Sequence, residues 1–291
     1  MKDLNIFCFG FGQVAKNFIN KLNLEKFKVN LSVTSREKTK EKKINEISYN
    51  SFYFEDESFD PELITKLKEA THILVSIPPA NGNDLVLKNF SKIIEECNTE
   101  WITYLSATSV YGDHKGKWVN EESSTLPTSV NGIARLKAEK SWISLFGKKK
   151  LPIQIFRLSG IYSDQNNIFK RLKSGNANIV NIKNHLFSRV HVEDIANILL
   201  KSLSNFKPGE IYNISDDKPA SSEEVTLYAV KMLNTEKPKI IEEKNIKNEM
   251  LKNFYKDSKK VSNKKMKTFF NYDLKFPSYI EGLKHIRDNQ V

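Results

Sequence analysis

Residues Leu4 to Leu24 read LNIFCFGFGQVAKNFINKLNL, and the fold prediction starts from this segment. It begins with a short apolar run of strand length, which ends at Gly10-Phe11-Gly12, where two glycines break regular structure. Apolar residues then recur at spacings of three and four, which predicts a helix with one buried face: Val14, Ala15, Phe18, Ile19 and Leu22. The stretch therefore predicts a strand, a tight turn and a helix in succession.

The segments that follow continue this pattern. Lys28 to Thr34 has β-branched, extended character and completes a strand-helix-strand unit, whose two strands should run parallel. Further strands and helices are predicted in alternation: strands at 50–54, 72–77, 101–105 and 153–158, and helices at 61–70, 85–97 and 128–146. Such alternation predicts an α/β fold of the Rossmann type, with a doubly wound, mainly parallel sheet covered on both faces.

The pattern loosens beyond Gly160. Short segments at 177–182 and 210–214 alternate with helices and with a lysine-rich stretch at 244–267. We expect residues 1–160 to form an NAD(P)-binding domain, joined by a returning segment at about 189–205. Residues 161–291 should form a smaller, mixed α/β substrate-binding lobe. With 291 residues, 39% of them hydrophobic, the chain is long enough to bury a core of this size.

The net charge of +11 raises the possibility of a nucleic-acid or membrane partner. Only six of the 46 basic residues are arginines, however, and acidic residues separate many of the lysines, as in Lys38 to Lys43 (KTKEKK). We interpret such runs as solvated helix faces and loops, and Lys148 to Lys150 as an exposed connection. This distribution of charge favours neither nucleic acid nor a membrane surface as a partner. Membrane spanning and export are not expected either, because no run of 18 apolar residues and no secretion signal is found.

Two cysteines, Cys8 and Cys97, cannot build a framework of several disulfides, and Cys8 lies in an apolar run where an inert thiol is expected. A reducing compartment, the cytoplasm, is therefore predicted.

The turn after the first strand predicts a dinucleotide site. Its sequence fits G-x-G-x-x-A, in which Gly10 permits the turn, Gly12 lets a phosphate approach the backbone, and Ala15 lets helix and strand pack closely. A structural glycine turn is the alternative, but a strand before it and a helix after it favour a pyrophosphate held at the helix N-terminus. The predicted cofactor-binding residues are Gly10, Phe11, Gly12, Gln13, Val14 and Ala15.

The end of the second strand indicates which dinucleotide binds. An acidic residue there would hold the ribose hydroxyls of NAD, whereas an arginine accommodates the 2′-phosphate of NADP. The sequence offers Thr34, Ser35 and Arg36 at this point, with two hydroxyls and a guanidinium suited to phosphate. NADP is therefore predicted, with NAD as the other possibility; the alternative role for Arg36 is that of an exposed arginine in a basic chain.

Several further motifs occur together with the glycine turn. They are ILVSIPPANGND (73–84), YLSATSVYGD (104–113), RLSGIY (157–162), RVHVEDIA (189–196), IYNISDDKPAS (211–221), KKVSNKKM (259–266) and FPSYIEGL (276–283). By these motifs the chain resembles the extended short-chain dehydrogenase/reductases, the NAD-dependent epimerase/dehydratase superfamily of nucleotide-sugar enzymes, and in particular an atypical branch of it. The resemblance covers essentially the whole chain. We also place Ser76 and Pro78 among the cofactor-binding residues.

The resemblance implies a catalytic Ser or Thr, together with a Tyr and a Lys in a Y-x-x-x-K arrangement. In this sequence the hydroxyl position falls on Ala107, the tyrosine on Asn131 and the lysine on Arg135. Arg135 can still hold a ribose or phosphate oxygen, so we count it among the cofactor-binding residues, but neither it nor Asn131 can exchange a proton near neutral pH. The binding half of the machinery is kept, while the proton-transfer half is altered.

Substitute groups are present near the predicted cleft. Thr108, Tyr111, His114 and Tyr162 lie in suitable segments, and for each a structural role is the alternative. We take Thr108, Tyr111 and Asn131 as the candidate catalytic residues.

Two residues of the motif RVHVEDIA, Arg189 and His191, have candidate roles. His191 is predicted to be structural, since no second ligand lies at a metal-like spacing. The resemblance implies a phosphate-binding arginine four residues before this histidine, where this chain has Phe187. Arg189 lies two residues before the histidine and would face differently, and we take it as the candidate for a substrate phosphate.

Two functions follow from these assignments. The first is an NADP-binding oxidoreductase or epimerase that acts on a sugar, with a nucleotide-linked one as a candidate substrate, through altered catalytic positions. The second is a cofactor-binding sensor or regulatory module with little turnover. The resemblance also implies a homodimer that pairs the helices at 85–97 and 128–146.

Overall fold

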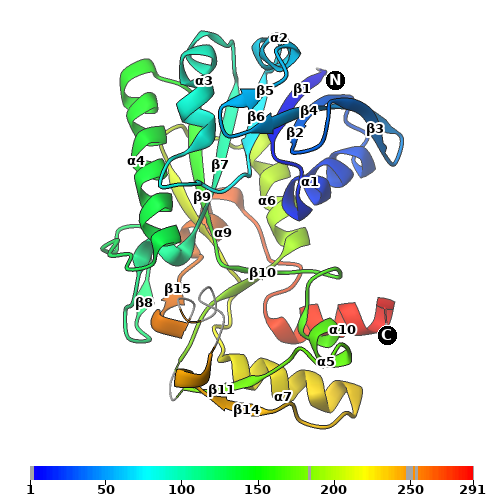
Figure 1. Ribbon diagram of the computed structural model, residues 1–291, viewed down its shortest axis with the longest axis vertical. Coiled ribbons are helices and arrows are strands. Elements are labelled where there is room, and N and C mark those ends of the chain that lie inside the picture. The colour runs from blue at the N-terminus through cyan, green and yellow to red at the C-terminus, as the bar shows by residue number, and fades with distance from the viewer. Residues whose placement is uncertain (1–2, 183–184, 247–251, 253–254, 291) are drawn as a thin grey trace. The chain divides into compact units, whose positions relative to one another are not determined.

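The computed structural model describes residues 3–182, 185–246, 252 and 255–290 (Figure 1). The chain divides into two units that alternate along the sequence. Unit 1 comprises residues 1–107, 133–157 and 195–212, and unit 2 comprises residues 108–132, 158–194 and 213–291. The division at residue 160 expected from the sequence, with its returning segment at about 189–205, stays a prediction about which part of the chain serves the cofactor and which the substrate.

A nine-stranded sheet is found in the described part of the chain, in the order β13-β9-β7-β6-β1-β2-β4-β3, with β5 paired to β4. Parallel pairing joins β6 to β7, β1 to β6, β1 to β2 and β2 to β4, whereas β3 and β5 run antiparallel to β4. The strands are β1 (Leu4–Phe9), β2 (Val29–Ser35), β3 (Lys40–Ile44), β4 (Ile47–Glu55), β5 (Ser58–Phe59), β6 (His72–Val75), β7 (Trp101–Ala107), β9 (Ile153–Leu158) and β13 (Ile211–Ile214).

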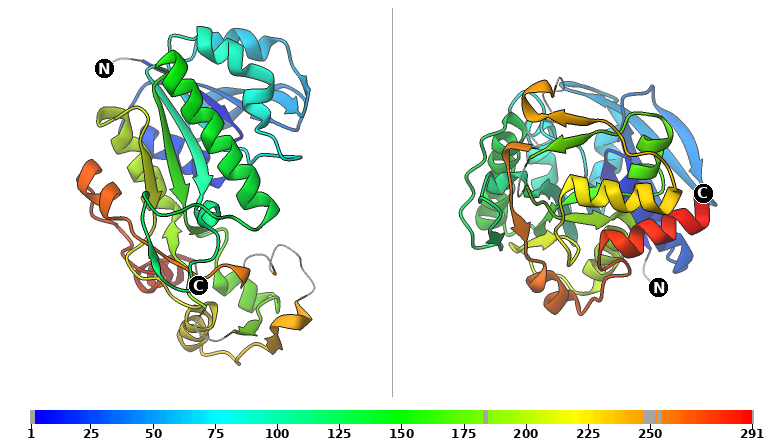
Figure 2. Two further views of the ribbon diagram at one scale, coloured as in Figure 1. Left: turned by 90° about the vertical axis from the view of Figure 1, so that its left-hand side faces the viewer. Right: turned by 90° about the horizontal axis from the view of Figure 1, so that it is seen from below.

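Helices cover both faces of this sheet (Figure 2). Alternate β1 residues, Phe7 and Phe9, join one core with buried residues of α2, α3 and α4. On the other face the α1 residue Phe18 stacks on Trp101, whose indole N–H donates to the hydroxyl of Ser202 in α6. The helices are α1 (Gln13–Leu24), α2 (Glu62–Lys68), α3 (Leu85–Glu96), α4 (Val130–Lys149) and α6 (Val192–Ser204). The predicted fold class, a doubly wound and mainly parallel α/β sheet, is confirmed.

The strand order reverses beside β1. From β1 the chain passes to β2 and β4 on one side of it, and then returns to β6 on the other side. In open α/β sheets the crevice at such a point, outside the carboxyl ends of the strands, is where ligands bind. The glycine turn after β1 lies at this position.

The charged run Lys38 to Lys43 corrects one prediction. It was interpreted as a solvated helix face or loop, yet Lys40–Ile44 forms the edge strand β3, and its Lys42 pairs with Tyr49 of β4. The run lacks the apolar alternation of a half-buried strand, since an edge strand can stay solvated. Its exposed lysines protect this edge from pairing with other chains. Similarly, Lys148 and Lys149 end α4 instead of lying in a connection.

Unit 2 is built from short parallel strand pairs and helices. The pairs are β10 with β12, β11 with β14 and β8 with β15. Its main core is formed by residues of β10, α5, α7 and α10, among them Tyr162, Phe169, Ala229 and Leu283. The elements are η1 (Thr108–Tyr111), β8 (Trp118–Val119), β10 (Gly160–Tyr162), α5 (Ile168–Lys173), β11 (Ile179–Asn181), β12 (Arg189–His191), α7 (Ser222–Leu233), β14 (Ile240–Glu242), η2 (Glu243–Asn245), β15 (Lys260–Val261), α9 (Lys264–Phe270) and α10 (Tyr279–Gln290).

Within the described ranges, every helix is too short or too polar to span a lipid bilayer.

Candidate functional site

Residues from three neighbouring strands fix the glycine turn after β1. Gly10 has a φ of +85°, and a Cβ there would lie 2.5 Å from Cγ2 of Ile77, so only glycine fits. The Gly10 N–H donates to Oγ1 of Thr34 at the end of β2 (2.8 Å). After β6, the Ser76 hydroxyl contacts the carbonyl oxygens of Phe9 (3.1 Å) and Gly10 (3.0 Å). Thr34 and Ser76 thus shape the turn, and the Thr34 hydroxyl oxygen is already engaged.

Gly12 leaves open space at the start of α1. It is the N-cap residue of this helix, no side chain caps the helix there, and no atom lies within 4 Å of the position that a Cβ would take. The first N–H groups of a helix have no partner inside it and favour an anion. Val14 and Ala15 are buried, and Ala15 lets the helix pack closely on the sheet. The turn therefore fits the pyrophosphate of a dinucleotide.

A cavity of about 500 Å³ lies in unit 1 beside this turn. Six of the twelve predicted cofactor residues line it. They are Gly10, Phe11, Thr34, Ser35, Arg36 and Pro78. The cavity therefore brings the glycine turn and the end of β2 together.

Several cavity residues were missed from the sequence. Lys16 of α1, Lys42 of β3 and Tyr49 of β4 line the same cavity, and the Tyr49 ring packs on Phe11 with 5.0 Å between ring centres. Lys42 and Tyr49 are adjacent because β3 and β4 form a hairpin. The available signal was the run Lys40 to Ile44 beside a predicted strand, since lysines are typical of edge strands.

The lining carries both signs of charge. The Arg36 side chain is 82% exposed, and its Nε lies 3.7 Å from Oε1 of Glu55, a loose contact. Lys40 and Lys42 both contact Oε2 of Glu37 at 2.8 Å. These lysine hydrogen bonds lower the pKa of Glu37 to about 2, so it is a carboxylate at neutral pH. Arg36 is thus more open to a ligand than Lys40 and Lys42, which Glu37 engages.

The candidate catalytic residues of unit 2 lie around η1. Thr108 is half-buried at its start, whereas Tyr111 is fully buried and donates to Oδ1 of Asn213 (2.7 Å). Asn131 is exposed at the start of α4. The next residue, Gly132, packs against η1, since a Cβ there would lie 2.8 Å from the carbonyl oxygen of Ser109. Thr108 and Asn131 are therefore brought to neighbouring segments, while the hydroxyl of Tyr111 is used in packing.

The remaining mapped positions belong to unit 1. Arg135 donates through Nη1 to the carbonyl oxygen of Leu105 near the end of β7. Ala107 is half-buried at the end of the same strand, and the hydroxyl of its neighbour Ser106 is buried without a hydrogen-bond partner. Arg135 is therefore anchored at the carboxyl end of the sheet, where the ribose of a bound dinucleotide is expected.

His114 and Tyr162, the other acids considered, have structural contacts. His114 Nε2 lies 3.1 Å from the carbonyl oxygen of Ser124. The Tyr162 hydroxyl is buried and donates to the carbonyl oxygen of Ser278 (3.3 Å). Burial raises the pKa of Tyr162, which makes the phenol a poorer proton donor at neutral pH.

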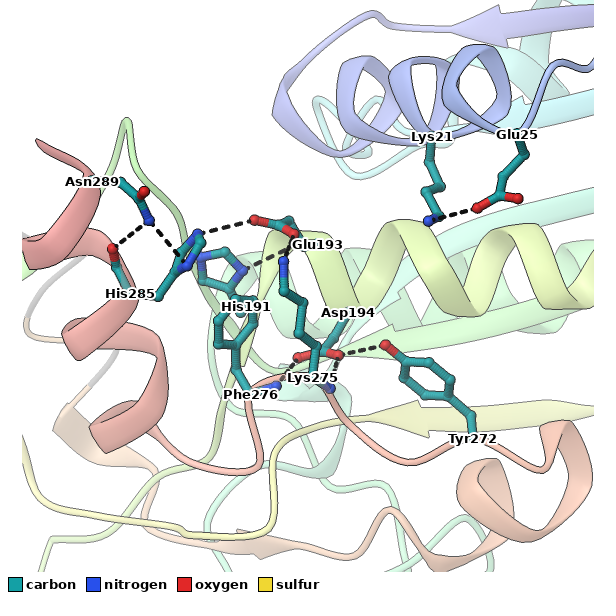
Figure 3. Close-up of polar contacts among 10 residues, drawn as sticks. All are labelled: Lys21, Glu25, His191, Glu193, Asp194, Tyr272, Lys275, Phe276, His285 and Asn289. Atoms are coloured by element: carbon teal, nitrogen blue, oxygen red, sulfur yellow. Dashed lines mark hydrogen bonds and ion pairs between the residues drawn. The ribbon is translucent and has the colours of Figure 1, made fainter.

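His191 lies at the junction between β12 and α6 (Figure 3). Its Nδ1 accepts a hydrogen bond from the backbone N–H of Glu193 (3.3 Å), in the manner of a helix cap. The next residue, Asp194, accepts from the Tyr272 hydroxyl (2.6 Å) and from the backbone N–H groups of Lys275 (2.7 Å) and Phe276 (3.0 Å). Burial lowers the pKa of His191 to about 4. These are the contacts of a structural histidine.

Arg189 lines a second cavity, of about 280 Å³, within unit 2. Its guanidinium lies 3.5 Å from the centre of the Phe187 ring and donates to the carbonyl oxygens of Ala220 (2.9 Å) and Ser221 (3.2 Å). Burial lowers the pKa of Arg189 to about 10, so it stays cationic at neutral pH. The exposed Arg171 lines the same cavity. Because Arg189 already donates hydrogen bonds to backbone carbonyl oxygens, Arg171 is the cation better placed for a ligand.

No group of three or more His, Cys, Asp or Glu side chains able to hold a metal ion is found among the described residues.

Comparison with known families gives one match to a family model. Residues 79–215 match the NAD dependent epimerase/dehydratase family. This matched part is somewhat less than half of the chain. It contains η1, the start of α4 and β12, the segments that carry the motifs quoted from the sequence. A search of curated protein sequences gave no match.

Solved structures of the same fold cover nearly the whole chain. A functionally unknown conserved protein from Silicibacter pomeroyi DSS is 28% identical, with a TM-score of 0.82 and 99% of each chain covered. The dTDP-glucose 4,6-dehydratase DesIV from Streptomyces venezuelae, with NAD and TYD bound, is 14% identical, with a TM-score of 0.79 and 99% and 98% covered. The UDP-glucose 4-epimerase from Thermotoga maritima, with UDP-glucose, is 14% identical, with a TM-score of 0.77 and all of both chains covered.

Proposed function

We propose that this chain is an NADP-binding member of an atypical branch of the extended short-chain dehydrogenase/reductases, and that it acts on a sugar, in particular a nucleotide-linked one. The observation that carries the proposal is the cavity of unit 1, where the glycine turn meets Arg36 at the carboxyl end of the sheet. Gly12 and the start of α1 would hold the pyrophosphate, and Arg36 the 2′-phosphate. When bound, the nicotinamide supplies hydride transfer.

The cavity of unit 2 supports a nucleotide-sugar substrate. Tyr255, Tyr279 and Phe187 give it aromatic walls, and Arg171 adds a cation that can meet a phosphate. Proteins of the same fold from Streptomyces venezuelae and Thermotoga maritima were solved with TYD and with UDP-glucose. We propose that this cavity serves the substrate side of the reaction.

Thermal shift measurements on the protein with saturating NADP test the substrate class. A nucleotide sugar that binds the folded state must raise the melting temperature, and we expect UDP- and dTDP-sugars to do so where the free sugars do not. Arg171→Gln should lower the shift without changing the melting temperature of the unliganded protein. If no nucleotide sugar stabilises the protein, the proposed substrate class is wrong.

The altered positions divide the work between binding and proton transfer. Arg135, as a permanent cation, can hold a ribose or phosphate oxygen, and Asn131 can orient a substrate oxygen by a hydrogen bond. Because Tyr111 is buried against Asn213, we propose that Thr108 and Asn131 position the substrate and that neither ionises. Any proton transfer must then involve a group other than these two.

A second candidate function is a cofactor-holding sensor or regulatory module. It is favoured by the same observation, since Asn131 and Arg135 keep the binding groups but remove the ionisable ones. Product analysis of each stabilising nucleotide sugar, together with the absorbance of reduced nicotinamide, separates the two, because an epimerase returns the hydride to the sugar and leaves the absorbance unchanged. A converted sugar supports the enzyme, whereas binding without conversion supports the sensor.

We also propose that two copies of the chain pair through α3 and α4. Val130 and Ile133, which are 75% and 53% exposed, lie three residues apart in the first turns of α4 and so on one face of that helix. Light scattering should give the mass of a dimer at micromolar concentration, and the mass of a monomer would contradict the pairing. A cytoplasmic location is proposed on the free, buried Cys8 and Cys97.

A further inference from the structure

Arg36 alone makes a weak 2′-phosphate site. Its side chain is 82% exposed, and the nearest carboxylate oxygen, Oε1 of Glu55, is 3.7 Å away. A solvated guanidinium on a flexible stem gains little from a single ionic contact. If the proposed preference for NADP holds, a further cation in the same cavity would explain how the site discriminates between the two dinucleotides.

Lys42 is such a cation. It is placed by β3, the edge strand through which the chain passes between the parallel neighbours β2 and β4. Its register partner is Tyr49, which is buried and packs on Phe11 of the glycine turn. Lys42 lines the cavity together with Arg36, and its side chain is only 27% exposed. The hairpin therefore brings a partly buried lysine beside the glycine turn.

Glu37 holds Lys42 in this place. Oε2 of Glu37 lies 2.8 Å from Nζ of Lys42 and 2.8 Å from Nζ of Lys40. The backbone N–H of Glu37 is in turn 3.3 Å from Oγ of Ser35, which fixes the start of the loop after β2. An ammonium has three N–H donors, so the contact with Glu37 leaves donors of Lys42 for a second anion.

We propose that Lys42 is the second cation that recognises the 2′-phosphate of NADP, with Glu37 as its positioning residue. This inference rests on the proposed NADP-binding function and assigns its selectivity to two residues from different strands. Arg36 supplies the guanidinium at the end of β2, and Lys42 supplies an ammonium from β3. Parallel neighbours are usually connected by a helix, whereas β2 and β4 are connected through β3. In this proposal β3 serves cofactor recognition.

Lys40 offers a matched control. It lies two residues before Lys42 on the same strand and face, and it contacts the same oxygen of Glu37 at the same distance. It is not among the residues that line the cavity. A loss of NADP affinity caused by disturbing Glu37 would therefore appear in both lysine variants. A loss caused by removing a phosphate contact would appear only in the Lys42 variant.

Calorimetric titration of NADP and NAD into wild type, Lys42→Met and Lys40→Met tests the inference. We expect Lys42→Met to weaken NADP at least about tenfold and to leave NAD unchanged, because a charge-assisted contact to phosphate is lost. Lys40→Met should change neither affinity by more than about twofold. Circular dichroism and the NAD affinity show that each variant is folded, and Lys42→Gln repeats the test with a polar side chain.

The outcomes separate the inference from the function on which it rests. If wild type prefers NADP and Arg36→Ala loses the preference while Lys42→Met and Lys42→Gln keep it, Lys42 has no part and the inference alone is overturned. Equal losses in the Lys40 and Lys42 variants overturn it too, since Glu37 would then be the cause. A wild type without preference for NADP overturns both the inference and the proposed cofactor.

Discussion

Arg157 and Glu139 form a buried, two-point ion pair inside unit 1. Nε of Arg157 lies 3.0 Å from Oε1 of Glu139, and Nη2 lies 2.7 Å from Oε2, with side chains that are 5% and 3% exposed. Glu139 lies four residues after Arg135, the position mapped to the catalytic lysine, and Arg157 begins the motif RLSGIY. The helix that carries the mapped positions and one of the motifs behind the resemblance therefore meet in a structural contact between α4 and β9.

This pair gives a prediction about stability. Arg157→Met leaves the carboxylate of Glu139 buried without its partner, which should cost about 3–5 kcal/mol of folding free energy. The double variant Arg157→Met with Glu139→Leu removes both charges and should recover much of that loss. Urea unfolding measures both. A single variant as stable as wild type would show that water or another group replaces the arginine.

A comparison of Gly10 and Gly12 separates folding from binding at the glycine turn. Gly10→Ala places a Cβ 2.5 Å from Ile77 at a positive φ, so it should destabilise the fold by about 1–3 kcal/mol. A Cβ at Gly12 meets no neighbouring atom, so Gly12→Val should fold, with its side chain in the space beside the start of α1. We expect Gly12→Val to weaken both dinucleotides by at least about tenfold.

Melting temperatures and cofactor titrations of these two variants check the division. If Gly12→Val bound NADP as tightly as wild type, the phosphate cradle would lie elsewhere.

Tyr111 should matter for stability and not for chemistry. Tyr111→Phe removes the hydroxyl that donates to buried Asn213 and leaves an acceptor without that donor, which should cost about 1–3 kcal/mol. Any turnover that the wild type shows should survive when measured well below the melting temperature. A fall of two orders of magnitude in rate, with cofactor binding intact, would instead assign Tyr111 a catalytic role.

His191 should make stability depend on pH on the acid side. Its pKa falls from 6.5 to about 4 on folding because the ring is buried, and the neighbouring groups are Glu193, His285 and Lys275. The unfolded chain therefore binds the proton more readily. Its contribution is complete above about pH 6.5 and is lost as the pH falls towards 4, in total about 3 kcal/mol.

The control for this dependence is His191→Gln, which does not titrate. Its melting temperature should fall less steeply between pH 6.5 and 4 than that of wild type, and parallel curves would show that other groups dominate.

The fold was predictable from local patterns, whereas part of the site was not. The glycine turn and the spacing of Val14, Ala15 and Phe18 determine a strand-turn-helix locally, and the later alternation determines the sheet. Lys42 could not be assigned to the cavity from the sequence, because its position depends on the register of the hairpin between β3 and β4. The sequence of β3 has no apolar alternation from which that register could be predicted. The occupation of Arg189 by the carbonyl oxygens of Ala220 and Ser221 likewise depends on tertiary packing.

The central claim is that unit 1 holds NADP through the glycine turn and Arg36. Titration of NADPH and NADH into wild type and Arg36→Ala measures it most directly. We predict that wild type binds NADPH at least about tenfold more tightly than NADH, and that Arg36→Ala costs about 1.5–3 kcal/mol for NADPH and little for NADH. Equal affinities of the wild type for the two dinucleotides would contradict the claim.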